Sequence, residues 1–417
     1  MKTAPKTPVG QPPLWQGLDA TFLKRRKFLL IALVMVCVIS FSMGHGSHID
    51  FNVTFAGGVA VHHGHTYLNA NEIGRIHKML HLGYSRKLAG VPYGPPPLIA
   101  LVFLPLSMLQ YSNAFLLFMC FVIACWLVLF FAISPESRIP LAMISVVSMP
   151  AISGFYTGNI SIVVGPLFLL SFIAIQKGRF RTAAIVLGVT AALKLFPLAL
   201  FGVFLFKRKW RETAWGVGVV ALSYVLTLAV LGVHRFGEII RFTIKIANSI
   251  PIFSPNDSLP GFVKYQTNNA AVGSLIATIA TLGFLFLLFR LRSLPFDRYF
   301  AVMGTLLIFC QRQSWDHYYF FAFPMILLMW QKRRSLSRPL FLIAALGALL
   351  IIDIRGVIFL LSGEKLNALV EHLSSGILIE PQVLGAVILL PLAIYLFRAT
   401  EPENVESRVR SLEQTSS

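Results

Sequence analysis

Long apolar stretches separated by short polar or basic segments recur along this sequence. Residues 28–41 and 115–133 are apolar on every face of a helix, whereas the strands of a membrane β-barrel alternate apolar and polar positions. One helical crossing of a bilayer needs about 20 apolar residues. The pattern therefore predicts an all-α, polytopic membrane protein, a helical bundle with about 10–12 membrane helices, some of them re-entrant or broken.

Five basic clusters predict how these stretches lie across the membrane, because Lys and Arg collect on the cytoplasmic side. The clusters occupy residues 24–27, 177–181, 207–211, 290–292 and 332–338. Residues 1–27 would then be a basic cytoplasmic N-terminus, residues 28–397 a single transmembrane domain and residues 398–417 a disordered cytoplasmic tail. The segments expected on the extracytoplasmic side are an extended first loop, 44–94, and the polar loops 234–269, 312–318 and 363–381.

The predicted order of crossings runs outward at about 28–43, inward at about 96–111 and outward at about 114–133. Residues 134–176 would make one net inward crossing, with a broken or re-entrant helix before a span at about 160–176, since Pro140, Pro150 and Pro166 interrupt them. Residues 182–206 lie between two basic clusters, which favours a short helical hairpin dipping into the membrane. A single crossing is the alternative.

Composition supports the membrane assignment. Of the 417 residues, 56% are hydrophobic and 13% are charged, whereas soluble domains carry roughly 25% charged residues. The net charge of +19 follows from the basic clusters, so no nucleic-acid partner is expected. The four cysteines lie in apolar stretches without metal-ligand spacing.

Acidic residues concentrate in the segments expected outside the membrane, so any reaction is expected on that face. Asp50 follows the first apolar stretch by only a few residues, which places a carboxylate at the membrane boundary. A solvated acid at a helix end is the simpler interpretation. The other acids assigned to this face are Glu72, Glu136, Glu238, Asp257, Asp316, Glu364, Glu371 and Glu380.

The densest polar segment is Arg312–Tyr319, between two apolar stretches. An aromatic belt at the membrane interface would explain Trp315 and the tyrosines, but not Arg312, Asp316 and His317 beside them. These residues are therefore candidates for a functional site. Lys194 is a further candidate, because an unpaired ammonium in an apolar hairpin is costly and suggests a phosphate or carboxylate partner. Snorkelling to the interface is the alternative.

Seven of the ten histidines lie between residues 45 and 81. His62, His63 and His65 could bind a transition metal, but their spacing matches no familiar motif, and surface or lipid-phosphate contact is the favoured interpretation. We therefore expect neither a metal site nor a cofactor.

The order of several short motifs resembles glycosyltransferase family 87, membrane enzymes of the GT-C superfamily that use polyprenyl-phosphate sugars. The resembling motifs are Asp50-Phe51, Gly64 with Tyr67, Tyr93–Leu98, Gly158–Ser161, Leu193–Pro197 before the basic run at 207–211, Asn256–Gly261 and Ser314–His317. Two departures stand out: Gly94 splits a Tyr-Pro-Pro pattern, and Gly158-Asn159-Ile160-Ser161 replaces a Gly-Gln-x-Asn turn.

The resemblance implies a GT-C-type bundle and a metal-independent, inverting transfer of a hexose, with mannose favoured. The donor would be a polyprenyl-phosphate sugar and the acceptor a lipid or glycan hydroxyl, in a multi-pass protein of the plasma or inner membrane whose active site faces outward. Asp50 and His317 would be catalytic. The expected substrate-binding residues are Arg312, Lys264 and Lys194, which could stabilise the leaving phosphate in that order, with Trp315, Asp316, Tyr93, Asn159 and Asn256. A transporter or flippase of a lipid-linked glycan is the alternative function.

Overall fold

The computed structural model describes residues 48–64, 97–234, 258–353 and 381–399, with residues 236, 237, 240, 241 and 244. The predicted N-terminus, the span at 28–43, the loop at 363–381 and the tail beyond residue 399 lie outside the described residues. All regular elements of the described ranges are helical. The prediction of an all-α, polytopic membrane protein is confirmed.

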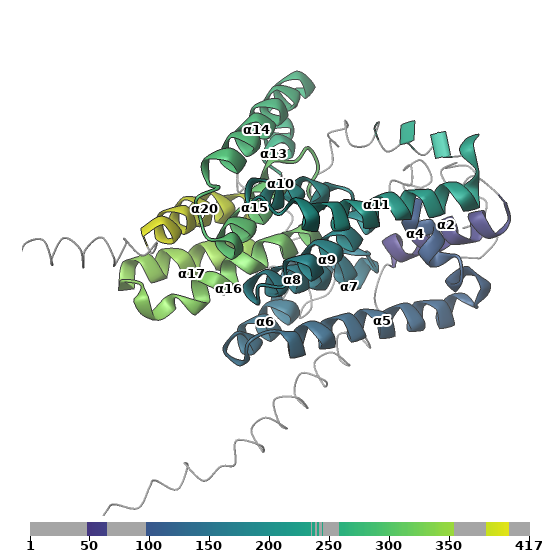
Figure 1. Ribbon diagram of the computed structural model, residues 1–417, viewed down its shortest axis with the longest axis horizontal. Coiled ribbons are helices and arrows are strands. Elements are labelled where there is room, and N and C mark those ends of the chain that lie inside the picture. The colour runs from purple at the N-terminus through teal and green to yellow at the C-terminus, as the bar shows by residue number, and fades with distance from the viewer. Residues whose placement is uncertain are drawn as a thin grey trace, which may run out of the picture.

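The first half of the described chain contains α2 (Ile49–His62), α4 (Pro97–Phe103), η2 (Leu106–Met108), α5 (Tyr111–Ala132), α6 (Pro135–Val147), α7 (Met149–Thr157), α8 (Ser161–Gln176), α9 (Phe180–Leu193), η3 (Phe196–Leu200), α10 (Phe201–Phe206) and α11 (Trp210–Leu231). The second half contains α13 (Leu259–Thr267), α14 (Ala270–Arg290), α15 (Phe296–Cys310), η4 (Asp316–Ala322), α16 (Phe323–Gln331), η5 (Arg333–Ser335), α17 (Arg338–Ile352) and α20 (Pro381–Ala399). Figure 1 shows α8 and α9 near the centre of the bundle, with α2 and α4 near one extremity and α17 and α20 near the other.

Four of the described helices are long and apolar enough to cross a membrane: α5, α11, α14 and residues 381–398 of α20. Much of their apolar surface is exposed. On α14, Leu282 and Phe286 are largely exposed, while the buried side follows one helical stripe of Gly273, Ala277, Ala280, Phe284 and Leu288. Exposed apolar area of this extent on a water-soluble protein would favour aggregation, so these faces fit contact with lipid.

Small residues bring α9 and α11 close together. A Cβ added at Gly188 would lie 2.4 Å from the backbone oxygen of Gly216, and one added at Gly216 would lie 2.5 Å from the backbone oxygen of Ala184. Close backbone approach at small residues is a common way for membrane helices to pack, because lipid leaves little hydrophobic force between them.

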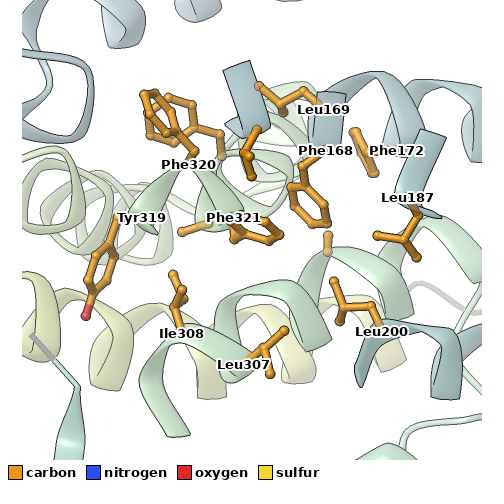
Figure 2. Packing of buried hydrophobic residues seen from close by; sticks show 14 of the residues in the cluster. Phe168, Leu169, Phe172, Leu187, Leu200, Leu307, Ile308, Tyr319, Phe320 and Phe321 are labelled. Carbon is orange, nitrogen blue, oxygen red and sulfur yellow. The ribbon is translucent and has the colours of Figure 1, made fainter. Parts of the chain in front are cut away.

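An aromatic core holds η4 in the middle of the protein. Phe168 of α8 stacks on Phe321 of η4 at 4.1 Å and on Phe300 of α15 at 5.0 Å between ring centroids, and Figure 2 shows Phe321 beside Phe168. Phe320 packs against Gly165 of α8, where an added Cβ would lie 2.6 Å from the ring. These contacts fix the position of the residues just before them in η4, including His317.

At one end of the bundle, lysine side chains donate hydrogen bonds to backbone oxygens near the C-termini of other helices. Lys177 donates a hydrogen bond to the backbone oxygen of Ala132 at 2.7 Å, and Lys207 donates one to Leu294. Both bonds satisfy carbonyl groups at or just beyond helix C-termini, which have no partner within their own helix. We call the end that carries Lys177, Lys207 and Arg298 the basic end.

The structure changes the predicted order of crossings. At its start α5 lies beside α2, where the Tyr111 hydroxyl donates to the Asn52 side chain and Phe115 stacks on His48 at 4.1 Å. Its last residue, Ala132, lies at the basic end. Because α5 runs toward the basic end, the predicted outward direction of 114–133 is wrong, and so is the outer position of the start of α6, which carries Glu136.

The predicted span at 96–111 is likewise not a crossing. Its helix α4 ends at Phe103, just before Pro105, which cannot donate the next helical hydrogen bond. Phe103 packs on Phe51 at 5.7 Å between ring centroids, and its backbone lies against Gly58 of α2. Residues 134–157 then lead away from the basic end in two helices that break at Ser148, whose side chain caps α7, and α8 returns. The predicted helix break is therefore present, at Ser148. However, residues 134–176 cross the bundle twice, through α6 with α7 and then through α8, instead of once.

Residues 180–206 form a hairpin, as the basic clusters that flank residues 182–206 predicted. Phe180 at its start and Phe204 near its end both contact the ring of Phe296, at 5.1 and 4.9 Å between centroids. A single crossing would place these two phenylalanines at opposite ends of the bundle. Lys194, the residue that follows α9, has extended backbone angles and lies at the tip of this hairpin.

Candidate active site

Asp50 lies in the first turn of α2, within the segment expected to be an extended loop. His48, just before the helix, has a left-handed backbone with φ of 47°, and its N–H donates to the backbone oxygen of Tyr156 in α7 at 3.2 Å. Asp50 is half-buried, whereas Phe51 beside it is fully buried. The carboxyl group is therefore at the edge of the core and close to the end of α7.

The turn after α7 brings Asn159 to this carboxyl group. Gly158 ends α7 with φ of +68°, and a Cβ at this position would lie 2.6 Å from the Cβ of Phe51. Glycine is required here for both reasons, because other residues rarely adopt this conformation and none would fit. Asn159 then donates a hydrogen bond from Nδ2 to Oδ2 of Asp50 at 2.8 Å.

Lys194 approaches the same site from the tip of the re-entrant hairpin. Its side chain is only 9% exposed, and its Nζ lies 3.8 Å from the centroid of the Tyr318 ring. Burial lowers the pKa of Lys194 to about 7, and the nearby negative charge of Asp50 opposes this shift. A buried ammonium without such partners would be strongly destabilising, so the aromatic face and the carboxylate explain why it is tolerated.

His317 and Tyr318 enter from η4. His317 is 8% exposed, and its Cβ lies 3.9 Å from the position that a Cβ on Gly154 of α7 would occupy. Burial, and then the charge of Lys194, hold the pKa of His317 well below its ordinary value. The imidazole is therefore neutral at pH 7 and can accept a hydrogen bond. Tyr318 stacks on Phe196 of η3 at 4.9 Å.

Four of the residues singled out from the sequence thus come together: Asp50, Asn159, Lys194 and His317. They belong to α2, the α7–α8 turn, the hairpin tip and η4. Tyr318 completes the group through its contact with Lys194. It was inside the predicted polar segment but was not selected, because its role depends on a residue far away in the sequence.

Other expected site residues lie elsewhere or nearby. Lys264 is on α13, where its side chain packs against Gly273 of α14. Arg312 is half-buried in the loop before η4, and its backbone oxygen accepts a hydrogen bond from Ser258 at 3.4 Å. Trp315 is half-buried and immediately precedes η4. Asp316 begins η4, with its side chain outside the described set.

Tyr93 and Asn256 lie outside the described residues. So do four of the seven histidines between residues 45 and 81, including His65 of the possible metal site. His62 and His63 are exposed at the end of α2. Among the described residues, no three His, Cys, Asp or Glu side chains are grouped closely enough to hold a metal ion.

The arrangement offers three chemical functions within one buried group. The carboxylate of Asp50 can accept a proton, the ammonium of Lys194 can stabilise an anion, and the neutral imidazole of His317 can accept or donate a hydrogen bond. Asp50 lies near the start of α5, at the other end of this helix from the basic end. Groups of this kind suit a transfer in which a hydroxyl loses a proton while a phosphate leaves.

Comparison with known proteins identifies the family of this chain. A search of curated proteins finds no match. The family model for glycosyltransferase family 87 matches residues 95–363, which include Asn159, Lys194 and His317, while Asp50 and α2 precede the matched range. Because the match covers more than half of the 417 residues, this chain belongs to glycosyltransferase family 87.

Proposed function

We propose that this protein transfers a hexose, with mannose favoured, from a polyprenyl-phosphate sugar to a hydroxyl of a lipid or glycan acceptor. The reaction is metal-independent and inverts the anomeric centre. It takes place on the extracytoplasmic face of the plasma or inner membrane. The convergence of Asp50, Lys194 and His317 from three separate elements carries the proposal.

Asp50 is the proposed general base. The acceptor hydroxyl is a poor nucleophile while it keeps its proton, so a positioned carboxylate that takes the proton as the new bond forms accelerates attack. In this step the acceptor oxygen bonds to the anomeric carbon, the bond from that carbon to the phosphate oxygen breaks, and the proton passes to Asp50. A single displacement of this kind inverts the anomeric centre.

Lys194 is the proposed partner of the leaving phosphate. The lipid monophosphate gains negative charge as the glycosidic bond breaks, and a fixed ammonium group in a water-poor site stabilises it. The sequence ranked Arg312 and Lys264 ahead of Lys194. Burial beside Asp50 and Tyr318 now favours Lys194, whereas the stem of the Lys264 side chain packs against Gly273 of α14.

His317 is proposed to act with Asp50. Its neutral imidazole can accept a hydrogen bond from the acceptor hydroxyl, directly or through one water. This hydrogen bond would orient the hydroxyl as its proton moves to Asp50. The position of Lys194 close to both groups favours this pairing. A protonated imidazole at this place would be repelled by the ammonium group.

The two ends of the bundle support the proposed side of the membrane. Asp50 lies near the end of α5 that is opposite to the basic end, and basic clusters favour the cytoplasm. A lipid-linked donor would enter laterally from the bilayer, which fits a site built among membrane helices. A transporter would also have broken helices, but the clustering of a base and a phosphate-stabilising cation favours chemistry over passage.

The test is sugar transfer by the purified protein in vesicles. A panel of radiolabelled polyprenyl-phosphate sugars is incubated with total lipid extract, in the presence and absence of EDTA. We expect one donor to give a labelled, chloroform-soluble or glycan product, with EDTA without effect. Transfer from nucleotide sugars alone, or loss of transfer in EDTA that a divalent cation restores, would overturn the proposal.

A further inference from the structure

We propose that Asn159 is a positioning residue that occupies one oxygen of the Asp50 carboxylate and so leaves the other oxygen free to accept the proton. The sequence suggested a substrate-binding role for Asn159 instead. This inference rests on the proposed function, in which Asp50 is the base. It assigns to the α7–α8 turn the task of orienting that base.

The hydrogen bonds of the Asn159 side chain determine which way its amide points. The backbone N–H of Ser161 donates to Oδ1 of Asn159 at 2.8 Å. Because a backbone N–H can only donate, the atom facing it must be the oxygen. The NH₂ group is therefore turned toward Asp50, where it donates to Oδ2 at 2.8 Å.

The backbone of Asn159 is held as firmly as its side chain. Its own N–H donates to the backbone oxygen of Gly154 at 3.0 Å, and its backbone oxygen accepts from Ile162 at 3.1 Å. Gly158 presses the turn against Phe51, the neighbour of Asp50. The donor is thus fixed before any substrate arrives, which is how a base is kept in one productive orientation.

Both ends of the amide are engaged within the protein. A substrate-binding role would require Asn159 to share these atoms, whereas a positioning role uses them as they are. The N-terminus of α8 is also not free to bind a phosphate, because the first N–H groups of this helix already donate to Asn159 and Ile160.

Removing the donor should therefore alter how Asp50 holds its proton. A carboxylate that loses a hydrogen-bond donor keeps its proton to higher pH. The other ionisable groups near Asp50 stay the same in both variants, but Asn159→Asp adds a second carboxylate, whose charge also favours the protonated form of Asp50. Those carried by the elements packed around Asp50 are His48, Tyr111, Tyr156, Lys194, His317 and Tyr318.

The experiment compares Asn159→Asp and Asn159→Ala with Ser161→Ala. Asn159→Asp keeps the shape and the acceptor for the Ser161 N–H, but replaces the donor to Asp50 with a second acceptor. We expect kcat to fall at least about tenfold in both Asn159 variants, with KM within about twofold. The acidic limb of the pH–rate profile should move to higher pH, most in Asn159→Asp. Ser161→Ala retains the backbone N–H and should match the parent.

A second measurement does not depend on turnover. Hydrophobic carbodiimides modify protonated carboxyl groups, so the pH dependence of Asp50 labelling, read by peptide mass spectrometry, should shift in the same direction in the Asn159 variants. A rise in KM with an unmoved pH profile and unmoved labelling would overturn the inference and return Asn159 to substrate binding. If the parent transferred no sugar, the proposed function would fail, and the labelling alone would decide whether Asn159 controls Asp50.

Discussion

The Nζ atom of Lys194 lies 3.8 Å from the centroid of the Tyr318 ring. This contact joins the tip of the re-entrant hairpin to η4, two elements that enter the site from different parts of the chain. The aromatic face partly replaces the water that the ammonium loses on burial. The ring and the carboxylate of Asp50 thus favour the charged form of Lys194 against the cost of burial, and the negative charge of a departing phosphate would favour it further.

Replacing Lys194 should remove most of the activity. Lys194→Met keeps much of the apolar side chain and deletes the charge, and we expect transfer to fall by about 10² to 10³, the range found when one electrostatic contact to a transition state is lost. Measured kcat in vesicles checks this.

Arg211→Met is the matched control, because it also removes one cation, from an exposed position at the start of α11. This variant should transfer sugar at the parental rate. Equal losses in both variants would mean that charge in general, and not the position of Lys194, supports activity.

Asp50→Asn should abolish the base while leaving the fold intact. The amide oxygen of the new side chain can still accept the hydrogen bond from Asn159, so packing should persist. Transfer should drop at least about a hundredfold, since a positioned base contributes a factor of about 10² to 10⁴.

Thermal unfolding of the same preparation serves as the control for folding, and Asp297→Asn at the start of α15 controls for loss of a carboxylate. If Asp50→Asn transferred sugar at a near-normal rate, another acidic residue would have to be the base, and Asp316 would be the first to test.

The sequence predicted a hairpin at 182–206 because basic clusters at both ends of a short apolar segment constrain both ends to one side. It did not predict the order of crossings between residues 97 and 176. No basic cluster lies there, so directions were assigned by simple alternation. Pro105 and Ser148 then decided where helices end, and only packing against α2 shows that α4 turns back.

The sequence indicated which residues could carry the chemistry of the site, but not which of them contact one another. Lys194 and His317 stood out because ionisable groups are rare and costly beside apolar segments, while the catalytic roles of Asp50 and His317 came from the family resemblance. The bond between Asn159 and Asp50, 109 residues apart, depends on the contact of Gly158 with Phe51. No local pattern encodes such a contact, because it arises only when α2 and α7 pack.

Gly158→Ala should damage both stability and activity. A left-handed backbone costs a residue with a Cβ roughly 1–2 kcal/mol, and here the added Cβ would also lie 2.6 Å from Phe51. We expect a lower melting temperature and a large loss of transfer, because displacement of the turn moves Asn159 away from Asp50.

Gly178→Ala separates these two effects. Gly178 has a similar φ of +69°, with nothing within 4 Å of an added Cβ. This variant should show the backbone penalty alone and keep its activity. If Gly158→Ala behaved identically to Gly178→Ala, the close contact with Phe51 would have no role in the site.

His317 should make the stability of the protein depend on pH. Its pKa in the folded state lies well below the ordinary value of about 6.5 that it has when unfolded. The unfolded chain therefore binds more protons as pH falls, so the contribution of His317 is fully present above about pH 6.5 and is lost below it.

His317→Asn removes this titration while keeping a polar side chain. Melting temperatures of parent and variant in detergent, measured between pH 8 and 5, should converge as pH falls. A parent curve that runs parallel to the variant curve across this range would show that the pKa of His317 is the same in the folded and unfolded protein.

The revised order of crossings can be tested by cysteine labelling in a cysteine-free background. The structure puts Asn113, at the start of α5, at the same end of the bundle as Asp50, and Ser134, just after α5, at the basic end with Lys177. Both Asn113 and Ser134 are exposed. Alternation of the apolar stretches predicted the opposite arrangement for these two positions.

In intact cells, a membrane-impermeant maleimide should therefore label Asn113→Cys, and should label Ser134→Cys and Lys209→Cys only after the membrane is opened. Labelling of Ser134→Cys from outside, with Lys209→Cys protected, would contradict the path of α5 through the bundle and restore the order inferred from the sequence.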